Sequence, residues 1–277
     1  RCFVLATVAA MASACAGPAG APSSGGGTTF PTSDAVGSQD AGGSQDAGAT
    51  DIVTPQEIAQ APAPSNLVVN DKKKSPAGAS WTWLVYMHAD NNLEPFALYD
   101  LQEMAAVGST NDLHIVVQID RAAGHSADGV LNLGNFEGAK RLIVKEGQLQ
   151  ELSDLGELDR DNPDTLADFV GWGLKSYPAD RVAVVLWNHG GGTTYGGDES
   201  VPGSHGMDLN GIAAGLDKGM KQAGVARLDV IGFDACLMAT WESAGAFAPF
   251  ADYLLASEEL EPGFGWDYRS LKLLRDV

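Results

Sequence analysis

Buried strands that alternate with amphipathic helices constrain the fold of this chain more than any other feature of its sequence. Four short segments are almost continuously apolar: 81–87, 113–119, 181–187 and 228–233. Three longer segments between them repeat apolar residues at helical spacing: 93–107, 163–176 and 211–222. A strand without a polar face is buried on both sides. The order of these segments therefore predicts an α/β fold, a mostly parallel sheet with helices on both faces.

A few weaker signals complete the expected element order. Two weaker strands are predicted near 130–136 and 141–144, and a further strand near 253–256. Asn91 and Asn92 are expected to cap the first helix. Pro163 is expected at the first position of the second helix, where a missing N–H costs nothing. Asp90 and Asn91 are also expected to shape the rim of a loop.

The first 16 residues have the composition of a targeting segment. They begin with a basic residue and continue with small apolar side chains, which is typical of the end of a signal peptide. The run that ends at Cys15 resembles a bacterial lipobox, in which the cysteine is lipidated and becomes the new N-terminus. Ordinary cleavage after Ala14 or Ala16 is the alternative. We therefore expect a secreted or cell-surface bacterial lipoprotein, in the outer membrane or periplasm, with membrane attachment through an N-terminal lipid.

Residues 17–78 have a composition that a packed domain does not use. They are rich in Gly, Ala, Ser and Pro and contain few large apolar side chains. Such a segment buries too little surface to offset its ordering entropy, so we expect a disordered linker. The folded domain is accordingly placed at residues 79–277.

The charge and the cysteine count exclude several classes of protein. The formal net charge is −19, and the residues after 75 hold 30 acidic and 13 basic side chains. Such a surface repels nucleic acid, so no nucleic-acid partner is expected. The three cysteines, Cys2, Cys15 and Cys236, form neither a disulfide framework nor the paired spacing of a zinc site. No metal ligands are predicted from the sequence, and Cys236 is the one cysteine of the folded domain.

Reactive side chains follow two of the predicted parallel strands. His189 comes just after 181–187, and Cys236 comes just after 228–233. If these strands are neighbours, about 5 Å apart, the two side chains can face each other across the strand ends. A thiolate nucleophile needs a base within reach and N–H donors for the oxyanion. Gly190 and the two glycines after it leave the backbone bare and can present an amide donor, and the amide of Cys236 is the natural second donor.

The sequences around these residues resemble the two catalytic blocks of the clostripain family of cysteine peptidases. The blocks read Val-Val-Leu-Trp-Asn-His-Gly-Gly at 184–191 and Asp-Val-Ile-Gly-Phe-Asp-Ala-Cys-Leu-Met at 229–238. Residues 83–94 resemble the opening strand and loop of the family, and residues 256–268 resemble its segment after the cysteine. The resemblance implies a caspase-like fold with a dyad of His189 and Cys236 and an oxyanion hole formed by the amides of Gly190 and Cys236.

The resemblance also implies a substrate class. Family members cleave proteins and peptides after Arg or Lys, with acidic residues in the specificity pocket. Asp234 matches the acidic position two residues before the nucleophile, and Asp267 matches a second pocket acid less closely. A carboxylate beside the nucleophile would bind a guanidinium or ammonium group through charge-assisted hydrogen bonds. The alternative, in which Asp234 has a structural role and holds the end of the strand, is equally well supported by the sequence. Calcium is a candidate cofactor by the same resemblance.

The chain departs from the family in two ways, and two other functions stay open. Family members often mature by cutting themselves at a basic residue after the histidine, but residues 190–215 contain neither Lys nor Arg. Family members also continue beyond the position that matches Val277, so we expect a C-terminally truncated domain. One alternative is a non-catalytic surface binding protein on the same fold. The other is a different cysteine hydrolase, such as an amidase, which an acidic pocket beside Cys236 would disfavour.

Overall fold

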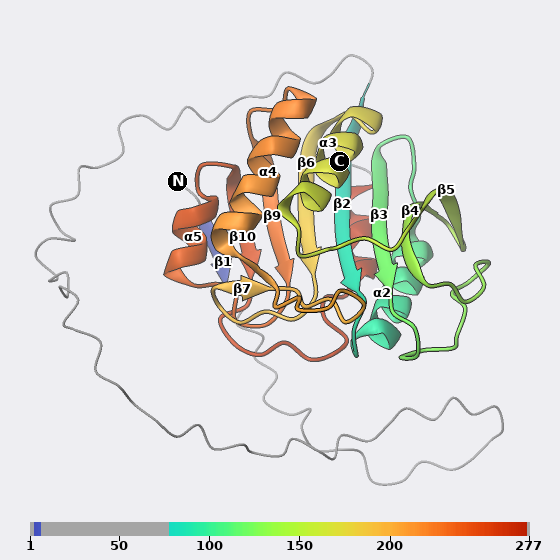
Figure 1. Cartoon of the computed structure of the whole chain (residues 1–277). Helices are drawn as coiled ribbons and strands as arrows, with labels where there is room; N and C mark the ends of the chain where they lie inside the picture. The colour runs from blue at the N-terminus through green and yellow to red at the C-terminus, as the bar shows by residue number, and fades with distance from the viewer. Residues whose placement is uncertain (1–2, 7–77, 276–277) are drawn as a thin grey trace, which may run out of the picture. The chain divides into compact units, whose positions relative to one another are not determined.

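An eight-stranded sheet forms the centre of the computed structural model, which describes residues 3–6 and 78–275 (Figure 1). The spatial order of its strands is β1 (Phe3–Ala6), β10 (Ala251–Ala256), β9 (Leu228–Asp234), β6 (Ala179–Trp187), β2 (Ala79–Ala89), β3 (Leu113–Arg121), β4 (Gly138–Lys145) and β5 (Gln148–Gly156). The strands from β1 to β3 in this order are parallel to one another. β4 is antiparallel to both of its neighbours, β3 and β5. A small second sheet pairs β7 (Thr194–Tyr195) with β8 (Met207–Asp208). The predicted mostly parallel sheet is confirmed.

Helices cover both faces of this sheet (Figure 1). α2 (Glu94–Val107) and the 3₁₀ helix η1 (Tyr268–Leu274) pack on one face. α3 (Pro163–Ser176) and α4 (Leu209–Ala223) pack together on the other, and α5 (Trp241–Phe247) connects β9 to β10. Three of the α-helices begin at a side chain that accepts a hydrogen bond from a first-turn amide, which satisfies an otherwise unpaired donor. These caps are Asn162 for α3, Asp208 for α4 and Thr240 for α5.

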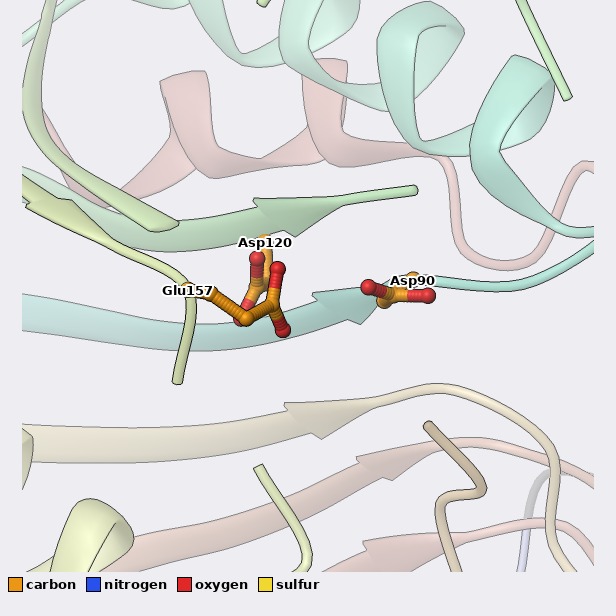
Figure 2. Close-up of side chains that lie close together, drawn as sticks. All are labelled: Asp90, Asp120 and Glu157. Carbon is orange, nitrogen blue, oxygen red and sulfur yellow. The ribbon is translucent and has the colours of Figure 1, made fainter. Parts of the chain in front are cut away.

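The chain reverses its direction across the sheet at β2. It moves from β2 to β3 on one side and returns through α3 to β6 on the other side. Open α/β sheets bind their ligands in the crevice that such a reversal leaves at the carboxyl ends of the strands. This edge is polar: Asp90 follows β2, Asp120 lies near the end of β3, and Glu157 follows β5 (Figure 2).

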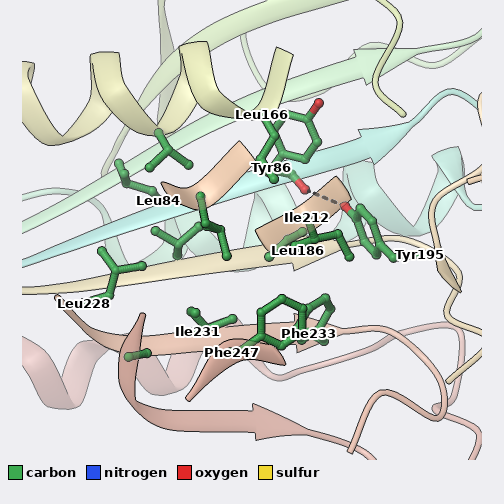
Figure 3. Packing of buried hydrophobic residues seen from close by; sticks show 14 of the residues in the cluster. Leu84, Tyr86, Leu166, Leu186, Tyr195, Ile212, Leu228, Ile231, Phe233 and Phe247 are labelled. Atoms are coloured by element: carbon green, nitrogen blue, oxygen red, sulfur yellow. Dashed lines mark hydrogen bonds between the residues drawn. The ribbon is translucent and has the colours of Figure 1, made fainter. Parts of the chain in front are cut away.

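Two hydrophobic clusters hold the helices on the sheet. The cluster under α3 and α4 includes Leu84, Tyr86, Ile231 and Phe233, all fully buried (Figure 3). Each such side chain contributes about 1.5–3 kcal/mol by leaving water. Tyr195 closes this cluster at the carboxyl ends of the strands, where its hydroxyl donates to the carbonyl oxygen of Tyr86 at 3.2 Å. The core therefore anchors the loop that follows β6.

The sequence was least informative at the antiparallel edge. The strand predicted near 130–136 is wrong, because this segment forms only an isolated bridge between Val130 and Leu133. β5 was not predicted, because its side chains are mostly polar and lie half in solvent. The prediction that Asn91 or Asn92 caps the first helix is also wrong. Leu93 is the N-cap of α2, and no side chain satisfies its amides in the usual way.

The N-terminal predictions concern residues that the structure mostly leaves out. Cys15 and the linker up to residue 77 lie outside the described residues, so lipidation and disorder stay predictions. Phe3–Ala6, assigned to a signal peptide from the sequence, forms β1 beside β10. Among the described residues, no helix combines the length and the apolar character needed to cross a membrane.

Candidate active site

The two strands that carry the predicted dyad are adjacent and end side by side. Trp187, the last residue of β6, pairs with Asp234, the last residue of β9. His189 and Cys236 each lie two residues beyond this pair. The expectation that the two strands are neighbours is confirmed, and both side chains leave the sheet at the same edge.

A pocket of about 230 Å³ opens where β6 and β9 end. His189 and Cys236 both line it, and so do Asp234 and Glu261. A cysteine, a histidine and two acids therefore share one concave site at the carboxyl ends of the parallel strands, where ligands are expected.

Asn92 fixes the protonation pattern of His189. The Nε2 atom of His189 lies 2.8 Å from Oδ1 of Asn92. Because an amide oxygen only accepts, Nε2 carries the ring proton and Nδ1 is left as the basic nitrogen. Loss of hydration lowers the pKa of His189, with the charge of Glu199 opposing this shift and His88 adding to it. A neutral imidazole with a free Nδ1 can accept the proton of a thiol. The sequence did not suggest this role for Asn92.

Gly190 lies so close to Cys236 that no side chain would fit. A Cβ atom at Gly190 would overlap the carbonyl oxygen of Cys236 and would lie 2.9 Å from Cγ of Met238. Gly190 also forms an isolated β-bridge with Tyr195. The bridge consists of two backbone hydrogen bonds, from the amide of Gly196 to the carbonyl of His189 and from the amide of Gly191 to the carbonyl of Thr194. The bridge therefore fixes Gly190 while leaving its own N–H out of these bonds.

The backbone turns sharply after Cys236. Leu237 has a φ of 63°, in the left-handed region that a leucine rarely adopts. Its amide donates to the carbonyl oxygen of Glu259 at 3.1 Å, and the amide of Ala239 donates to the carbonyl of Ser257 at 2.9 Å. The amide of Glu261 donates to Sγ of Cys236 at 3.3 Å. The segment 257–261 thus holds the turn and contacts the sulfur of Cys236.

Asp234 combines the two roles that the sequence left open. It is buried, and its Oδ2 accepts from the hydroxyl of Tyr268 at 2.8 Å and from the amide of Trp266 at 3.4 Å. These bonds tie the end of β9 to the segment before η1, which is a structural role. The same side chain lines the pocket beside Cys236, where it is also placed to meet a ligand.

Glu261 lies beside Asp234 and interacts with it, and no sequence pattern pointed to this pair of acids. Burial raises the pKa of Glu261 to about 9, and the charge of Asp234 adds to the shift. Burial also raises the pKa of Asp234, while hydrogen bonds from Glu261, Tyr268 and Trp266 oppose the rise. At neutral pH the pair therefore shares one proton, which resides on Glu261, and Asp234 carries the negative charge.

Asp267, the second predicted pocket acid, lies elsewhere. Its side chain accepts from the amide of Arg269 at 3.1 Å, caps η1 and pairs with the Arg269 guanidinium at 2.7 Å. It is exposed and is not among the residues that line the pocket. Glu261, and not Asp267, is the second acid that lines the pocket with Cys236.

Carboxylates that could hold a metal ion lie apart from this pocket. Asp90, Asp120 and Glu157 bring three oxygens within 4.8 Å of one another. The predicted rim role of Asp90 agrees with its contacts, since its carbonyl oxygen accepts from the amide of Glu199 at 3.0 Å. Oxygen ligands of this kind suit a hard cation such as Ca²⁺.

Comparison with known proteins points to a single family. The family model described as the clostripain family matches residues 85–276. Clostripain from Hathewaya histolytica is 27% identical over 246 residues, which cover 76% of this chain and 44% of that protein. The chain therefore spans less than half the length of this relative.

Two solved structures share the fold. A secreted C11 cysteine protease from Bacteroides thetaiotaomicron, in complex with an irreversible peptide inhibitor, matches with a TM-score of 0.58 and 25% identity, over 70% of this chain and 53% of its own. An inactive zymogen C11 protease from Parabacteroides distasonis matches with a TM-score of 0.55 and 25% identity, over 72% of this chain and 54% of its own. The predicted family resemblance is thereby confirmed.

Proposed function

Because this chain belongs to the clostripain family, we propose that it is a cysteine endopeptidase in which Cys236 is the nucleophile and His189 is the base. One observation carries the proposal: both side chains line the same pocket at the paired ends of β6 and β9. The secreted relative of known structure supports secretion of this protein as well.

The proposed reaction follows the positions of the groups. Nδ1 of His189 accepts the thiol proton of Cys236, and the thiolate attacks the carbonyl carbon of the scissile bond. The amides of Gly190 and Cys236 donate to the oxyanion that forms. His189 then returns the proton to the leaving amine, so that the C–N bond breaks and a thioester remains on Cys236. Water, deprotonated by His189, attacks the thioester and releases the acid product and the thiol.

The acid pair supports a preference for Arg or Lys before the cut bond. Asp234 carries a negative charge within the pocket, and Glu261 can supply a second one. A guanidinium that enters the pocket can pair with both carboxylates through charge-assisted hydrogen bonds. The proposed substrates are therefore proteins or peptides with a basic residue at this position.

Removing either acid should reduce selectivity for arginine. We compare kcat/KM on matched peptides that carry Arg or its neutral analogue citrulline before the cut bond. Hydrogen bonds to charge contribute about 1.5–3 kcal/mol, so Asp234→Asn should lower the Arg-to-citrulline ratio by about 10- to 150-fold. Glu261→Gln should lower it by a smaller factor, because Glu261 is protonated before the substrate binds. Glu258→Gln, an exposed acid of the same segment, is the matched control.

The melting temperature distinguishes a pocket role from a structural role. Asparagine keeps an oxygen that can accept from Tyr268, so Asp234→Asn should retain most of its stability. An equal loss of kcat/KM on both peptides, or a collapse in melting temperature, would show that Asp234 acts only by holding the strand end.

The arginine preference should increase with pH. Burial holds the pKa of Glu261 at about 9, so the neutral form predominates below that pH. A bound guanidinium favours the charged form, so binding releases a proton and strengthens as the pH rises. The Arg-to-citrulline ratio should therefore rise by up to about tenfold per pH unit between pH 7 and 9 and level off above. Titration of the dyad affects both peptides and cancels in the ratio. A ratio in the parent that is flat with pH, or one that still rises in Glu261→Gln, would contradict this assignment.

The acid pair also bears on the two alternative functions. An amidase for neutral substrates would gain nothing from two carboxylates beside the sulfur, so the pocket favours a peptidase for basic residues. A non-catalytic binding protein would not need a free Nδ1 on His189, which Asn92 secures here.

A further inference from the structure

Three aromatic rings lie together beside the proposed substrate pocket. Phe96 and Tyr99 are one turn apart on α2, and Phe264 meets both of them from the segment before η1. The ring centroids of Phe96 and Phe264 are 5.4 Å apart, and those of Tyr99 and Phe264 are 5.1 Å apart. Both contacts are edge-to-face, an arrangement that aromatic pairs prefer. We call these three side chains the aromatic shelf.

A tight turn joins the aromatic shelf to the pocket. The amide of Gly265 donates to the carbonyl oxygen of Pro262 at 2.8 Å, which closes a four-residue turn. Pro262, Gly263 and Gly265 line the pocket, whereas Phe264 is not among the residues that line it. The turn therefore forms part of the pocket wall and also carries the ring of Phe264 into the aromatic shelf.

Two glycines keep this turn thin. A Cβ atom at Gly263 would lie 2.8 Å from Cζ of Phe96, and a Cβ atom at Gly265 would lie 2.5 Å from Oδ1 of Asp234. Gly263 thus rests on the aromatic shelf, and Gly265 rests on the acid proposed to bind the substrate cation. Consecutive Cα atoms of a peptide are about 3.8 Å apart. A substrate residue next to the one in the pocket is therefore within reach of the aromatic shelf.

The aromatic shelf leaves apolar surface in contact with water. Phe264 is 52% exposed and Tyr99 is 39% exposed, although their rings touch each other. Leu93, three residues before Phe96, lines the pocket and extends the apolar surface up to it. An apolar substrate side chain placed on these rings would remove its own surface and theirs from water, which favours binding.

The order of the strands indicates which substrate residue meets the aromatic shelf. β10, β9 and β6 are consecutive in the sheet. Cys236 follows β9, so it lies between His189, which follows β6, and the segment that follows β10 and leads into the turn. His189 must reach the leaving amine, so the substrate residues after the cut bond lie toward β6. The residues before the cut bond then lie on the side of the turn.

We propose that the aromatic shelf binds an aromatic or large aliphatic side chain on the substrate residue that precedes the basic residue. This inference rests on the proposed peptidase function and adds a second determinant of its substrates. A second basic side chain fits less well, because the acids beside the aromatic shelf already have a cation. Arg269 lies 3.3 Å from Glu103 on α2 and 2.7 Å from Asp267.

The test measures peptide binding to the full chain with Cys236→Ala, so that binding does not depend on hydrolysis. Calorimetric titration compares end-blocked Ala-Phe-Arg-Ala with Ala-Ala-Arg-Ala. Phe before Arg should lower Kd about 5- to 20-fold, because a partly buried aromatic side chain gains part of its transfer free energy. Two further peptides are controls. Ala-Ala-Arg-Phe, with Phe after Arg, should gain less than about twofold, and Ala-Lys-Arg-Ala should bind less tightly than Ala-Phe-Arg-Ala.

Variants localise the gain from Phe to the aromatic shelf. Phe264→Ala removes the most exposed ring and should reduce the gain to less than about twofold. Tyr99→Ala changes the aromatic shelf from the helix, without altering the sequence of the turn, and should also reduce the gain. Leu273→Ala, which removes an exposed apolar side chain of η1, is the matched control and should keep it. Binding of Ala-Ala-Arg-Ala should stay the same in all three variants.

Several outcomes would overturn the proposal. These are an equal Kd for the Phe and Ala peptides, an undiminished gain in both Phe264→Ala and Tyr99→Ala, an equal gain from Phe after Arg, and tighter binding of the Lys peptide. Hydrolysis by the parent distinguishes this proposal from the peptidase function. Cleavage after Arg with equal kcat/KM on the Phe and Ala peptides would retain the peptidase and reject the aromatic shelf as a binding site. A gain in binding without hydrolysis would do the reverse.

Discussion

A Cys236→Ala variant is expected to lose peptide hydrolysis by at least about 10⁴-fold in kcat while keeping its fold. The proposed thioester cannot form without Sγ, and no other thiol lies among the described residues. Cys236 is only half-buried, so removal of its sulfur should cost little packing energy. The measurement is single-turnover cleavage of an arginine peptide, with circular dichroism as the check of folding.

Two further variants complete this test. Cys15→Ala removes a thiol outside the described domain and should leave kcat unchanged. His189→Ala should lose activity almost as completely as Cys236→Ala, because the two groups act as a unit. Substantial hydrolysis of peptide amides by folded Cys236→Ala would show that the proposed nucleophile is wrong.

A Gly190→Ala variant is expected to lose about 10²–10³-fold in kcat, the range seen when one oxyanion donor is lost. The added methyl group would overlap the carbonyl oxygen of Cys236, so the two segments must move apart. This movement takes the Gly190 amide away from the oxyanion, whereas the acidic pocket that binds the substrate cation is little changed. The loss should therefore appear in kcat more than in KM.

The neighbouring glycine provides a matched control. A Cβ at Gly191 meets the hydroxyl of Thr194 at 2.7 Å, and this side chain can rotate away. Gly191→Ala should therefore keep most of its activity. If Gly190→Ala has native kcat and native melting temperature, close contact between Gly190 and Cys236 is not needed for the reaction.

The sequence predicted the parallel half of the sheet well because burial leaves a strong pattern there. β6 and β9 were placed within two residues of their observed ends, and α3 was placed with Pro163 in its first turn. β5 was missed because an edge strand with one face in solvent lacks a continuous apolar run. Prediction thus succeeded where both faces of a strand are buried.

The candidate site was predictable only where it follows a strand directly. His189, Gly190 and Cys236 come just after apolar runs, and the order of the sheet brings them together. Glu261 reaches the pocket through backbone pairing of 237–239 with 257–259, which no local pattern reveals. Asn92 contributes through a contact 97 positions away in sequence. The placement of both depends on long-range packing.

At Leu237, with its left-handed backbone, selection for stability and selection for activity should favour different residues. A side chain with Cβ in this conformation is strained, and glycine there would relieve the strain. The same turn sets the direction of Cys236 and of its amide, and the segment 257–261 holds it in place. Screening variants for thermal stability alone would therefore favour replacements at position 237, while screening for turnover would favour retaining leucine. In a library selected for both properties, this position marks where tolerance to heat and catalytic rate trade against each other.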